Sequence, residues 1–332
     1  MSLRHFLVDD DLSPSEQQLV LDLADRMKEW PFAATPLAGP QSVAIIFDKP
    51  TLRTQASFSA GVAELGGYPM MVDGRLAQIG VRESVPDIAR VIGRQAAAIV
   101  WRTFNQQDLA DMATWSDVPV VNALTDAYHP CQILADLQTI RQHRGHLPGL
   151  TLAYVGDGSN NMANSYLVGG VTAGLHVRIG APVDFQPDPA VVARAEQIAA
   201  TTGGSVVVTD DAVAAVTGAD AVATDTWVSM GQEDDGRERT ATFTSYALDQ
   251  ALLDHASPEA LVLHCLPAYR GKEISAEVLE GPRSVVWDEA ENRRHVQKAV
   301  LAMLITCQRG AELDVTLLDE LVGNPVRVGE RS

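Results

Sequence analysis

The segment Thr51-Leu52-Arg53-Thr54 combines two hydroxyl groups and a cation where an apolar run gives way to a helical pattern, and Lys49 lies just before it. Free backbone N–H groups and the helix dipole favour anions at a helix N-terminus, so this combination suits a phosphate group. The glycines of a P-loop are missing, which argues against that kind of nucleotide site. The alternative is a capped helix start whose charges are solvated.

Arg102, His129 and Gln132 are further candidates, because each lies at or soon after the end of an apolar run. Open α/β sheets bind their ligands at the carboxyl ends of the strands. Arg102 could therefore join the anion site, with a surface ion pair as the alternative. The segment His129-Pro130-Cys131-Gln132 opens a helix and could polarise a carbonyl group, or it could form a packed turn.

Two polar segments of the second half could bind a nucleotide or an amine. The segment 156–161, Gly-Asp-Gly-Ser-Asn-Asn, begins like a dinucleotide fingerprint but has Asn161 where the third glycine is needed. Asn161 could hydrogen-bond a polar ligand or cap a helix. Asp225 follows an apolar run, where its carboxylate suits an ammonium group. The polar stretch after Asp225 could be a lid or an ordinary surface loop.

The segment His264-Cys265-Leu266-Pro267 ends another apolar run. Proline favours an extended conformation in the preceding residue, so we expect Leu266 to be extended and able to present its carbonyl group to a ligand. His129 and Cys131 with His264 and Cys265 could be imagined as zinc ligands, but their spacing is not that of structural zinc sites. Arg293, near the start of a long helical pattern, could reach the same region or remain solvated.

Short apolar runs alternate with helical patterns, which predicts an α/β fold whose parallel sheets are covered by helices on both faces. The runs fall into two groups, separated by a break near 146–149 that contains Pro148-Gly149. We expect ten strands, at Ser42–Phe47, Pro69–Val72, Ala97–Trp101, Pro119–Ala123, Leu150–Val155, Val177–Ile179, Ser205–Val208, Ala221–Thr224, Leu261–Leu266 and Ser284–Trp287.

Two helices have clear signals. Ser13-Pro14-Ser15-Glu16 contains a cap residue, a proline at the first helical position and a glutamate three residues after the cap, which predicts a helix to about Trp30. Glu291–Gln308 carries one apolar face and predicts a long helix. Leu313–Val322 is a shorter amphipathic segment.

Composition narrows the classes of function. The 332 residues carry 25 Lys and Arg against 43 Asp and Glu, a net charge of -18, which disfavours nucleic acid or an anionic membrane as a partner. Neither a signal sequence nor an apolar stretch of about 18 residues is present. The three cysteines show no metal or disulfide spacing, which fits a reducing cytoplasm.

In this order along the chain, these segments closely resemble the ornithine carbamoyltransferase family over roughly residues 42–299. Residues 51–55, Thr-Leu-Arg-Thr-Gln, stand where the family reads Ser-x-Arg-Thr-Arg. Aspartate carbamoyltransferases lack the Ser-Met-Gly and His-Cys-Leu-Pro elements. The segments that match as they stand are Arg102, His129-Pro-Cys-Gln132, Asp225 with Ser229-Met230-Gly231, His264-Cys-Leu-Pro267 and Glu291-Asn-Arg293.

The resemblance implies two α/β domains, each with a parallel sheet, joined by a helix near 132–144 and by the long helix from Glu291. Residues 1–148, completed by 291–322, would bind carbamoyl phosphate, and residues 149–290 would bind L-ornithine. The implied reaction transfers the carbamoyl group to the δ-amine of ornithine, which gives L-citrulline and phosphate in arginine metabolism. No cofactor and no metal is implied.

The resemblance also implies a role for individual residues. The catalytic group would be Arg102, His129, Gln132, Cys265 and Arg293. Carbamoyl phosphate would meet this group together with Thr51, Leu52, Arg53, Thr54, Leu266 and Gln78, the last contributed by a neighbouring subunit of a homotrimer or a multiple of trimers. Ornithine would meet Asn161, Asp225, Ser229 and Met230.

Two positions depart from the family pattern. Gln55 replaces an arginine and removes a cation, so we expect weaker binding of carbamoyl phosphate, and Tyr269 stands where many relatives carry another residue. The competing hypotheses are a transferase for another amine such as putrescine, an oxidoreductase that binds a nucleotide at 156–158, and a non-catalytic binding protein of the same fold.

Overall fold

The structure is a computed structural model that describes residues 3–49, 51–228, 239–311 and 316–322. Its contacts divide the chain into two compact units. Unit 1 comprises Met1–Asp126 with Glu291–Ser332, and unit 2 comprises Ala127–Ala290. None of the helices in these described ranges is long and apolar enough to cross a membrane.

Unit 1 contains a four-stranded parallel sheet in the order β2-β1-β3-β4. The central strands are apolar and buried, as expected for a parallel sheet with helices on both faces. Phe47 is paired with both Asp73 and Arg102, so the segments that follow these three strands emerge side by side. The strands are β1 (Ser42–Phe47), β2 (Tyr68–Asp73), β3 (Ala98–Arg102) and β4 (Val120–Leu124).

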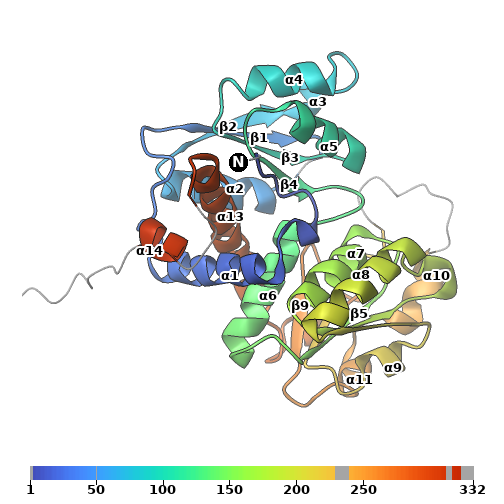
Figure 1. Ribbon diagram of the computed structural model, residues 1–332. Helices are drawn as coiled ribbons and strands as arrows, with labels where there is room; N and C mark the ends of the chain where they lie inside the picture. The colour runs from blue at the N-terminus through green and yellow to red at the C-terminus, as the bar shows by residue number, and fades with distance from the viewer. Residues whose placement is uncertain (1–2, 50, 229–238, 312–315, 323–332) are drawn as a thin grey trace, which may run out of the picture. The chain divides into compact units, whose positions relative to one another are not determined.

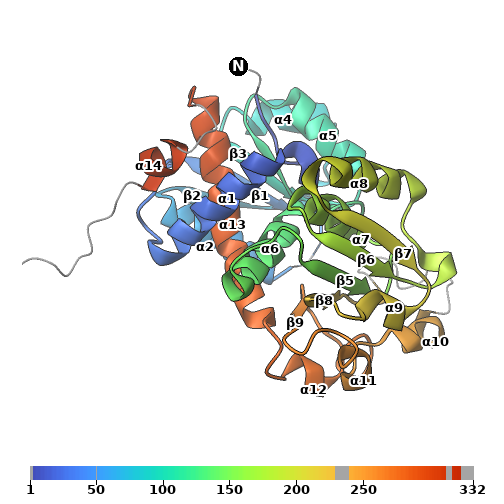
Figure 2. The same cartoon turned by 60° about the horizontal axis from the view of Figure 1, so that its bottom comes forward.

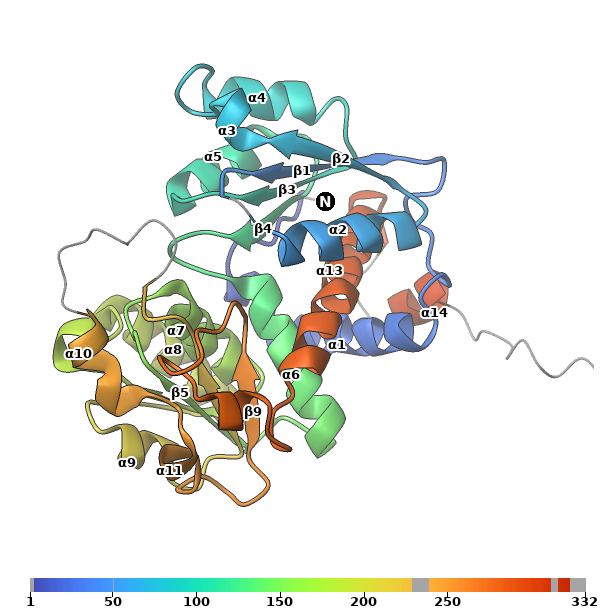
Figure 3. The ribbon, with the colours of Figure 1, turned by 180° about the vertical axis from the view of Figure 1, so that it is seen from behind.

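Helices cover both faces of this sheet. Figure 1 shows α3, α4 and α5 on one face and α1, α2 and α13 on the other, and Figure 3 shows the same layers from behind. The helices are α1 (Pro14–Glu29), α2 (Arg53–Glu64), α3 (Gly74–Ala77), α4 (Val85–Ile92), α5 (Gln106–Trp115), α13 (Val286–Gln308) and α14 (Thr316–Val322), and a 3-10 turn, η1, spans Asp9–Asp11.

The start of α1 confirms the expected capping box. The Ser13 hydroxyl accepts a hydrogen bond from the Glu16 backbone, and the Glu16 carboxylate accepts one from the Ser13 backbone. Pro14 occupies the first helical position, where its missing N–H costs nothing.

Unit 2 contains a five-stranded parallel sheet in the order β7-β6-β5-β8-β9, which Figure 2 shows across the sheet. Its strands and those of unit 1 confirm the first nine expected strands to within two residues at each end, and they confirm the α/β fold. The strands are β5 (Thr151–Val155), β6 (His176–Gly180), β7 (Ser205–Thr209), β8 (Ala221–Thr224) and β9 (Leu261–His264).

Helices flank this second sheet as well. Figure 2 shows α7 and α8 on one face and α9, α11 and α12 on the other. The helices are α6 (Pro130–Arg144), α7 (Asn161–Ser165), α8 (Pro189–Thr202), α9 (Ala212–Val216), α10 (Arg239–Phe243), α11 (Gln250–Leu253) and α12 (Ala276–Leu279). A π turn, η2, spans Tyr166–Gly170, and 3-10 turns span Val183–Phe185 (η3) and Thr244–Tyr246 (η4).

The tenth expected strand, Ser284–Trp287, is wrong. Ser284 forms only an isolated bridge with Val262, and α13 begins at Val286, five residues before the expected helix start. Asp288 and Glu289 occupy the first turn of this helix, where the dipole favours acidic side chains. An apolar run this short cannot by itself distinguish a strand from the buried start of a helix.

A buried ion pair fixes α13 against α2 in unit 1. Lys298 Nζ lies 2.5 Å from Glu64 Oε2 and also donates to the carbonyl of Met27. The Lys298 side chain is fully buried, and this burial lowers the pKa of its ammonium group. Because Lys298 lies on the helix that also carries Arg293, this pair helps to hold Arg293 in place.

We expect Glu64→Gln to lower the free energy of unfolding by about 3 kcal/mol, because it leaves a buried ammonium group without its counter-charge. Equilibrium denaturation checks this value. Glu29→Gln, at the exposed end of α1, is the control and should change stability by less than about 0.5 kcal/mol. Equal effects of the two substitutions would contradict a structural role for the ion pair.

Candidate active site

The predicted phosphate segment lies at the N-terminus of α2 in unit 1. Leu52 is the N-cap residue of α2, and no side chain caps this end of the helix. The Leu52 side chain is exposed, so this residue can offer a ligand only its backbone. Thr54 is buried, and the Thr51 hydroxyl lies 3.2 Å from that of Thr54. The uncapped helix start and the two hydroxyls therefore form a cradle suited to an anion.

Two buried arginines converge on Thr54. Its hydroxyl oxygen accepts a hydrogen bond from Arg293 Nη2 at 2.7 Å and a longer one from Arg102 Nη1 at 3.4 Å. Arg102 is 7% exposed and Arg293 is 4% exposed. With its oxygen occupied by guanidinium donors, the Thr54 hydroxyl can direct its own proton to a ligand. The structure thus brings Thr51, Thr54, Arg102 and Arg293 together within unit 1.

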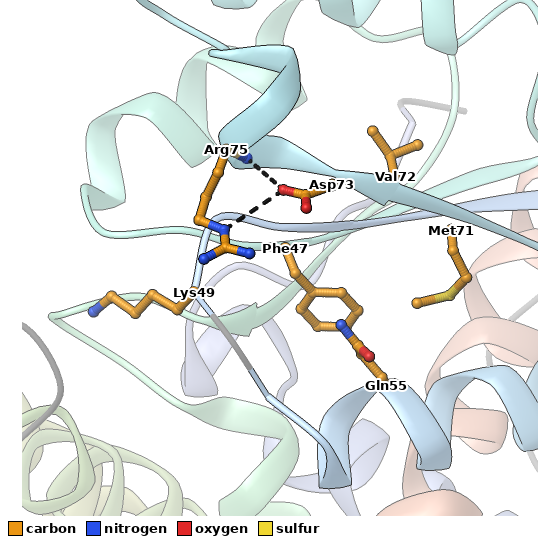
Figure 4. Close-up of a pocket in the computed structure, with 7 residues that line it drawn as sticks. All are labelled: Phe47, Lys49, Gln55, Met71, Val72, Asp73 and Arg75. Atoms are coloured by element: carbon orange, nitrogen blue, oxygen red, sulfur yellow. Dashed lines mark hydrogen bonds and ion pairs between the residues drawn. The ribbon is translucent and has the colours of Figure 1, made fainter.

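A hollow of about 360 Å³ lies beside this segment. Its lining residues are Phe47, Lys49, Gln55, Met71, Val72, Asp73 and Arg75. Figure 4 shows the Gln55 amide facing the hollow, with the ion pair of Arg75 and Asp73 at the opposite rim. An arginine at position 55 would have placed a further cation in this space.

Gln78 lies outside this cluster, in the exposed segment that follows α3. Its backbone is left-handed, with φ at 50°, and its backbone N–H donates to the Gly74 carbonyl. Gly74 itself approaches Asp48 so closely that a Cβ at this position would lie 1.8 Å from the carboxylate. The Gln78 segment is therefore docked on the carboxyl end of β1 through a residue at which any side chain would displace the Asp48 carboxylate.

His129 and Gln132 lie at the N-terminus of α6 in unit 2, and both are buried. The Gln132 amide nitrogen donates to Asp136 and to Glu289, each at 2.8 Å. These two carboxylates fix the orientation of the amide, because only its nitrogen can donate. The Gln132 oxygen is buried and accepts no hydrogen bond from the described part of the chain. This oxygen is an acceptor available for a ligand N–H group.

Sequence reasoning missed the carboxylates that hold Gln132. Asp136 also accepts from Tyr166 Oη at 2.6 Å, and Glu289 accepts from the backbone of His264 at 2.9 Å. Burial raises the pKa of Tyr166 well above its ordinary value, so its hydroxyl remains protonated and donates. The available signal was Asp136 four residues after Gln132, a helical spacing that places both side chains on one face.

Cys265 and Asp225 lie together at the carboxyl ends of β8 and β9. The Cys265 thiol donates to Asp225 Oδ1 at 3.2 Å. Asp225 is 7% exposed, and this burial raises the pKa of its carboxyl group. A buried carboxylate with a raised pKa gains from an ammonium partner, so this position suits an amine ligand.

The expected extended conformation of Leu266 is wrong. Its φ is 58°, in the left-handed region, and the peptide bond to Pro267 is cis. The Leu266 N–H donates to His264 Nδ1 at 2.9 Å, which turns the chain back toward the strand end. His264 Nε2 in turn lies 3.2 Å from Glu273 Oε1. His264 and Glu273 therefore hold the turn that presents Cys265 and Leu266.

The remaining predicted positions are distributed as follows. Asn161 begins α7, but the neighbouring Asn160 is the residue that caps this helix, through the Ala163 backbone. Asn161 is half-buried. Ser229 and Met230 lie outside the described residues.

One group could supply three metal ligands in the described ranges, namely Asp225, His264 and Cys265, whose ligand atoms lie within 4.8 Å of one another. His129 and Cys131 are not part of it. The group does not fit a metal, because His264 Nδ1 already accepts from Leu266 and Nε2 must carry the proton given to Glu273.

Comparison with known families identifies the family of the chain. Residues 4–142 match the carbamoyl-P binding domain of aspartate/ornithine carbamoyltransferases, and residues 148–304 match the Asp/Orn binding domain. The chain belongs to the aspartate/ornithine carbamoyltransferase family.

Individual relatives agree with this family. The chain is 58% identical to an ornithine carbamoyltransferase of Renibacterium salmoninarum over 306 residues, which cover 91% of this chain and 98% of the relative. It resembles the solved ornithine carbamoyltransferase of Gloeobacter violaceus with 44% identity and a TM-score of 0.83, covering 91% of this chain and 98% of that one. For the Pyrococcus furiosus enzyme the identity is 39%, the TM-score 0.88 and the coverage 94% and 99%.

Asp225→Asn is expected to raise the free energy of unfolding of the protein at neutral pH. Because the folded-state pKa of Asp225 is raised, its ionisation costs stability above that pKa, and the cost disappears at acidic pH where both states are protonated. The stability gain should therefore shrink as the pH falls toward about 4.

Urea denaturation at a series of pH values measures this difference. Asp184→Asn, at an exposed position of unit 2, is the matched control and should show no pH-dependent gain. A loss of stability in Asp225→Asn at neutral pH would show that the carboxylate is stabilised in the free protein.

Proposed function

We propose that the protein transfers the carbamoyl group of carbamoyl phosphate to the δ-amine of L-ornithine, which gives L-citrulline and phosphate. The observation that carries this proposal is the convergence of buried Arg102 and Arg293 on Thr54, at an uncapped helix start in a chain of net charge -18. The names of the relatives supply the acceptor, ornithine.

In this proposal unit 1 residues hold the donor. The backbone at Leu52 and the side chains of Thr51, Arg53, Thr54 and Arg102 bind the phosphate dianion, through charge-assisted hydrogen bonds that are stronger than neutral ones. Residues 1–148 with 291–322 act as the domain for carbamoyl phosphate. Arg293 and Arg102 also reach the carbamoyl group, where they stabilise negative charge as it develops on oxygen.

Unit 2 residues bind the carbamoyl nitrogen and the acceptor. The available oxygen of Gln132 and the carbonyl groups near Cys265 and Leu266 accept from the carbamoyl NH2 group, and His129 polarises its carbonyl. Residues 149–290 act as the ornithine domain. The ornithine contacts proposed there are Asn161, Asp225, Ser229 and Met230.

The reaction then follows from charge and position. The neutral δ-amine attacks the carbamoyl carbon, the oxyanion of the tetrahedral intermediate is stabilised by the preorganised donors, and phosphate departs with the electron pair of its C–O bond. The departing phosphate accepts the proton of the amine, and Cys265 and Asp225 lie near that amine. The leaving group is already activated in carbamoyl phosphate, so the proposal includes no cofactor or metal.

We further propose a homotrimer, or a multiple of trimers, in which Gln78 completes the phosphate site of a neighbouring subunit. The edge strand β2 and the segment after it expose apolar side chains, which supports an interface there. These side chains are Tyr68, Met71, Leu76 and Val81. A cytoplasmic location, a role in arginine biosynthesis and the absence of nucleic-acid or membrane partners complete the proposal.

A colorimetric assay for ureido products tests the activity, with ornithine, putrescine and aspartate compared side by side. We expect turnover with ornithine and little with the other two amines. Arg53→Ala should lower kcat/KM by at least about 100-fold, because it removes a preorganised cation from the donor site. Turnover of aspartate alone, or an Arg53→Ala variant as active as the parent, would contradict the proposal.

Gln55→Arg is expected to lower the KM for carbamoyl phosphate severalfold, because it adds a cation beside the dianion. The KM for ornithine serves as the internal control and should stay within about twofold. An unchanged KM for carbamoyl phosphate would show that position 55 does not contribute to the electrostatics of the donor site.

A further inference from the structure

A buried lysine lies directly before the phosphate segment and takes no part in the proposed mechanism. The Lys49 side chain is 7% exposed, and its Nζ lies 2.7 Å from Asp126 Oδ1. The same ammonium group lies 4.1 Å from the centre of the Phe104 ring. Burying a lysine is costly unless its charge is compensated, so this arrangement calls for an explanation.

The chain immediately before Lys49 is held from the opposite side. The Asp48 backbone N–H donates to the Arg102 carbonyl at 3.0 Å, and its carboxylate accepts from Trp101 Nε1 at 2.9 Å. Burial raises the pKa of Asp48, which still accepts the indole hydrogen bond. Asp48 therefore joins the end of β1 to the end of β3, where Arg102 lies.

Lys49 adds a second contact beyond the end of β3 and extends the connection to a third strand end, that of β4. Phe104 follows β3 and Asp126 follows β4, and the Asp126 N–H donates to the Phe104 carbonyl at 2.8 Å. Figure 4 shows the Lys49 side chain extending away from Gln55 and the hollow beside it. The ammonium group is thus directed to its own protein contacts rather than into that hollow.

We propose that Lys49 is a positioning residue for carbamoyl phosphate, which fixes the start of the phosphate segment by its ion pair with Asp126 and its contact with Phe104. The inference rests on the proposed function. Thr51 follows Lys49 by two residues and Arg53 follows it by four. A displaced Lys49 therefore moves the hydroxyl group and the cation that hold the phosphate. The position of these groups matters for binding, because charge-assisted hydrogen bonds to a phosphate depend on their geometry.

A purely structural role makes a different prediction. The Asp126 side chain is 58% exposed, so without Lys49 it becomes hydrated at little cost to stability. The positioning role therefore predicts a change in ligand binding that is much larger than the change in stability.

The test compares Lys49→Met, Asp126→Ala and the double variant in full-length protein. Each single substitution should raise the KM for carbamoyl phosphate about tenfold with kcat within about threefold. The double variant should be no worse than Lys49→Met, because both substitutions remove the same ion pair. Lys49→Arg should restore the KM to within about threefold. The melting temperatures of Lys49→Met and of the double variant should stay within about 3 °C of the parent, whereas Asp126→Ala should lower it further, because it leaves a buried ammonium group without its counter-charge.

Arg90→Met is the matched control. Arg90 makes the same two kinds of contact as Lys49, with Asp87 at 3.1 Å and over the Trp115 ring at 4.3 Å, but it lies on α4 away from the phosphate segment. Its KM should be that of the parent. Unchanged KM values in both single variants would overturn the inference. A KM increase in the double variant equal to the product of the two single increases would also overturn it, because it would indicate that Lys49 contacts the ligand itself.

Binding of inorganic phosphate, measured by calorimetry on the same variants, separates this inference from the proposed function. If the parent forms no citrulline, the proposed function fails, and a tenfold weaker phosphate affinity in Lys49→Met and Asp126→Ala still supports positioning by Lys49. Equal phosphate affinities in parent and variants would overturn it whatever the reaction.

Discussion

The account depends on concentrating positive charge at one buried point of a strongly acidic chain. Arg102 and Arg293 come from segments almost 200 residues apart and meet at a single hydroxyl, that of Thr54. Two guanidinium groups repel each other, and their burial is favourable only when hydrogen bonds and counter-charges compensate them. A dianionic ligand supplies such a counter-charge, so the arrangement favours the binding of an anion and needs supports that hold the arginines in place.

Much of that support consists of buried or half-buried carboxylates and the groups paired with them. Asp48 holds the strand end that carries Arg102, and Glu64 holds the helix that carries Arg293 through Lys298. In unit 2, Glu289 holds both Gln132 and the backbone of His264. Each carboxylate thus fixes a group that the proposal assigns to the ligand, or the element that bears it, which explains why acidic residues lie next to sites meant for an anion.

The sequence predicted the fold well where the local signals for a helix or strand agree with the packing that the segment has in the folded protein. The apolar runs and the capping box at Ser13 specify their elements without reference to distant residues. The predicted strand at Ser284–Trp287 was wrong because a short apolar run of four residues fits a strand and a buried helix start equally, and only the packing decides between them. The extended conformation predicted for Leu266 was wrong because a hydrogen bond to His264 sets its backbone, against the preference of a residue before proline for an extended conformation.

The site could be predicted only in part for a similar reason. Sequence motifs contain three of the site residues, Arg53, Arg102 and Cys265. Other residues act through partners that lie up to 157 residues away in the chain, namely Lys49, Asp48 and Glu289. No spacing rule links Gln132 to Glu289 or Lys49 to Asp126. Pairings of this kind become visible only when the strands are in register, because the sheet brings their carboxyl ends to one edge.

A crystal structure of the protein with phosphonoacetamide, a non-hydrolysable analogue of carbamoyl phosphate, tests the central claim most directly. The account predicts the phosphonate at the start of α2, within hydrogen-bond distance of the Thr51 and Thr54 hydroxyls and of the Arg102 guanidinium. A phosphonate bound elsewhere, with these groups unchanged around Thr54, would contradict the account.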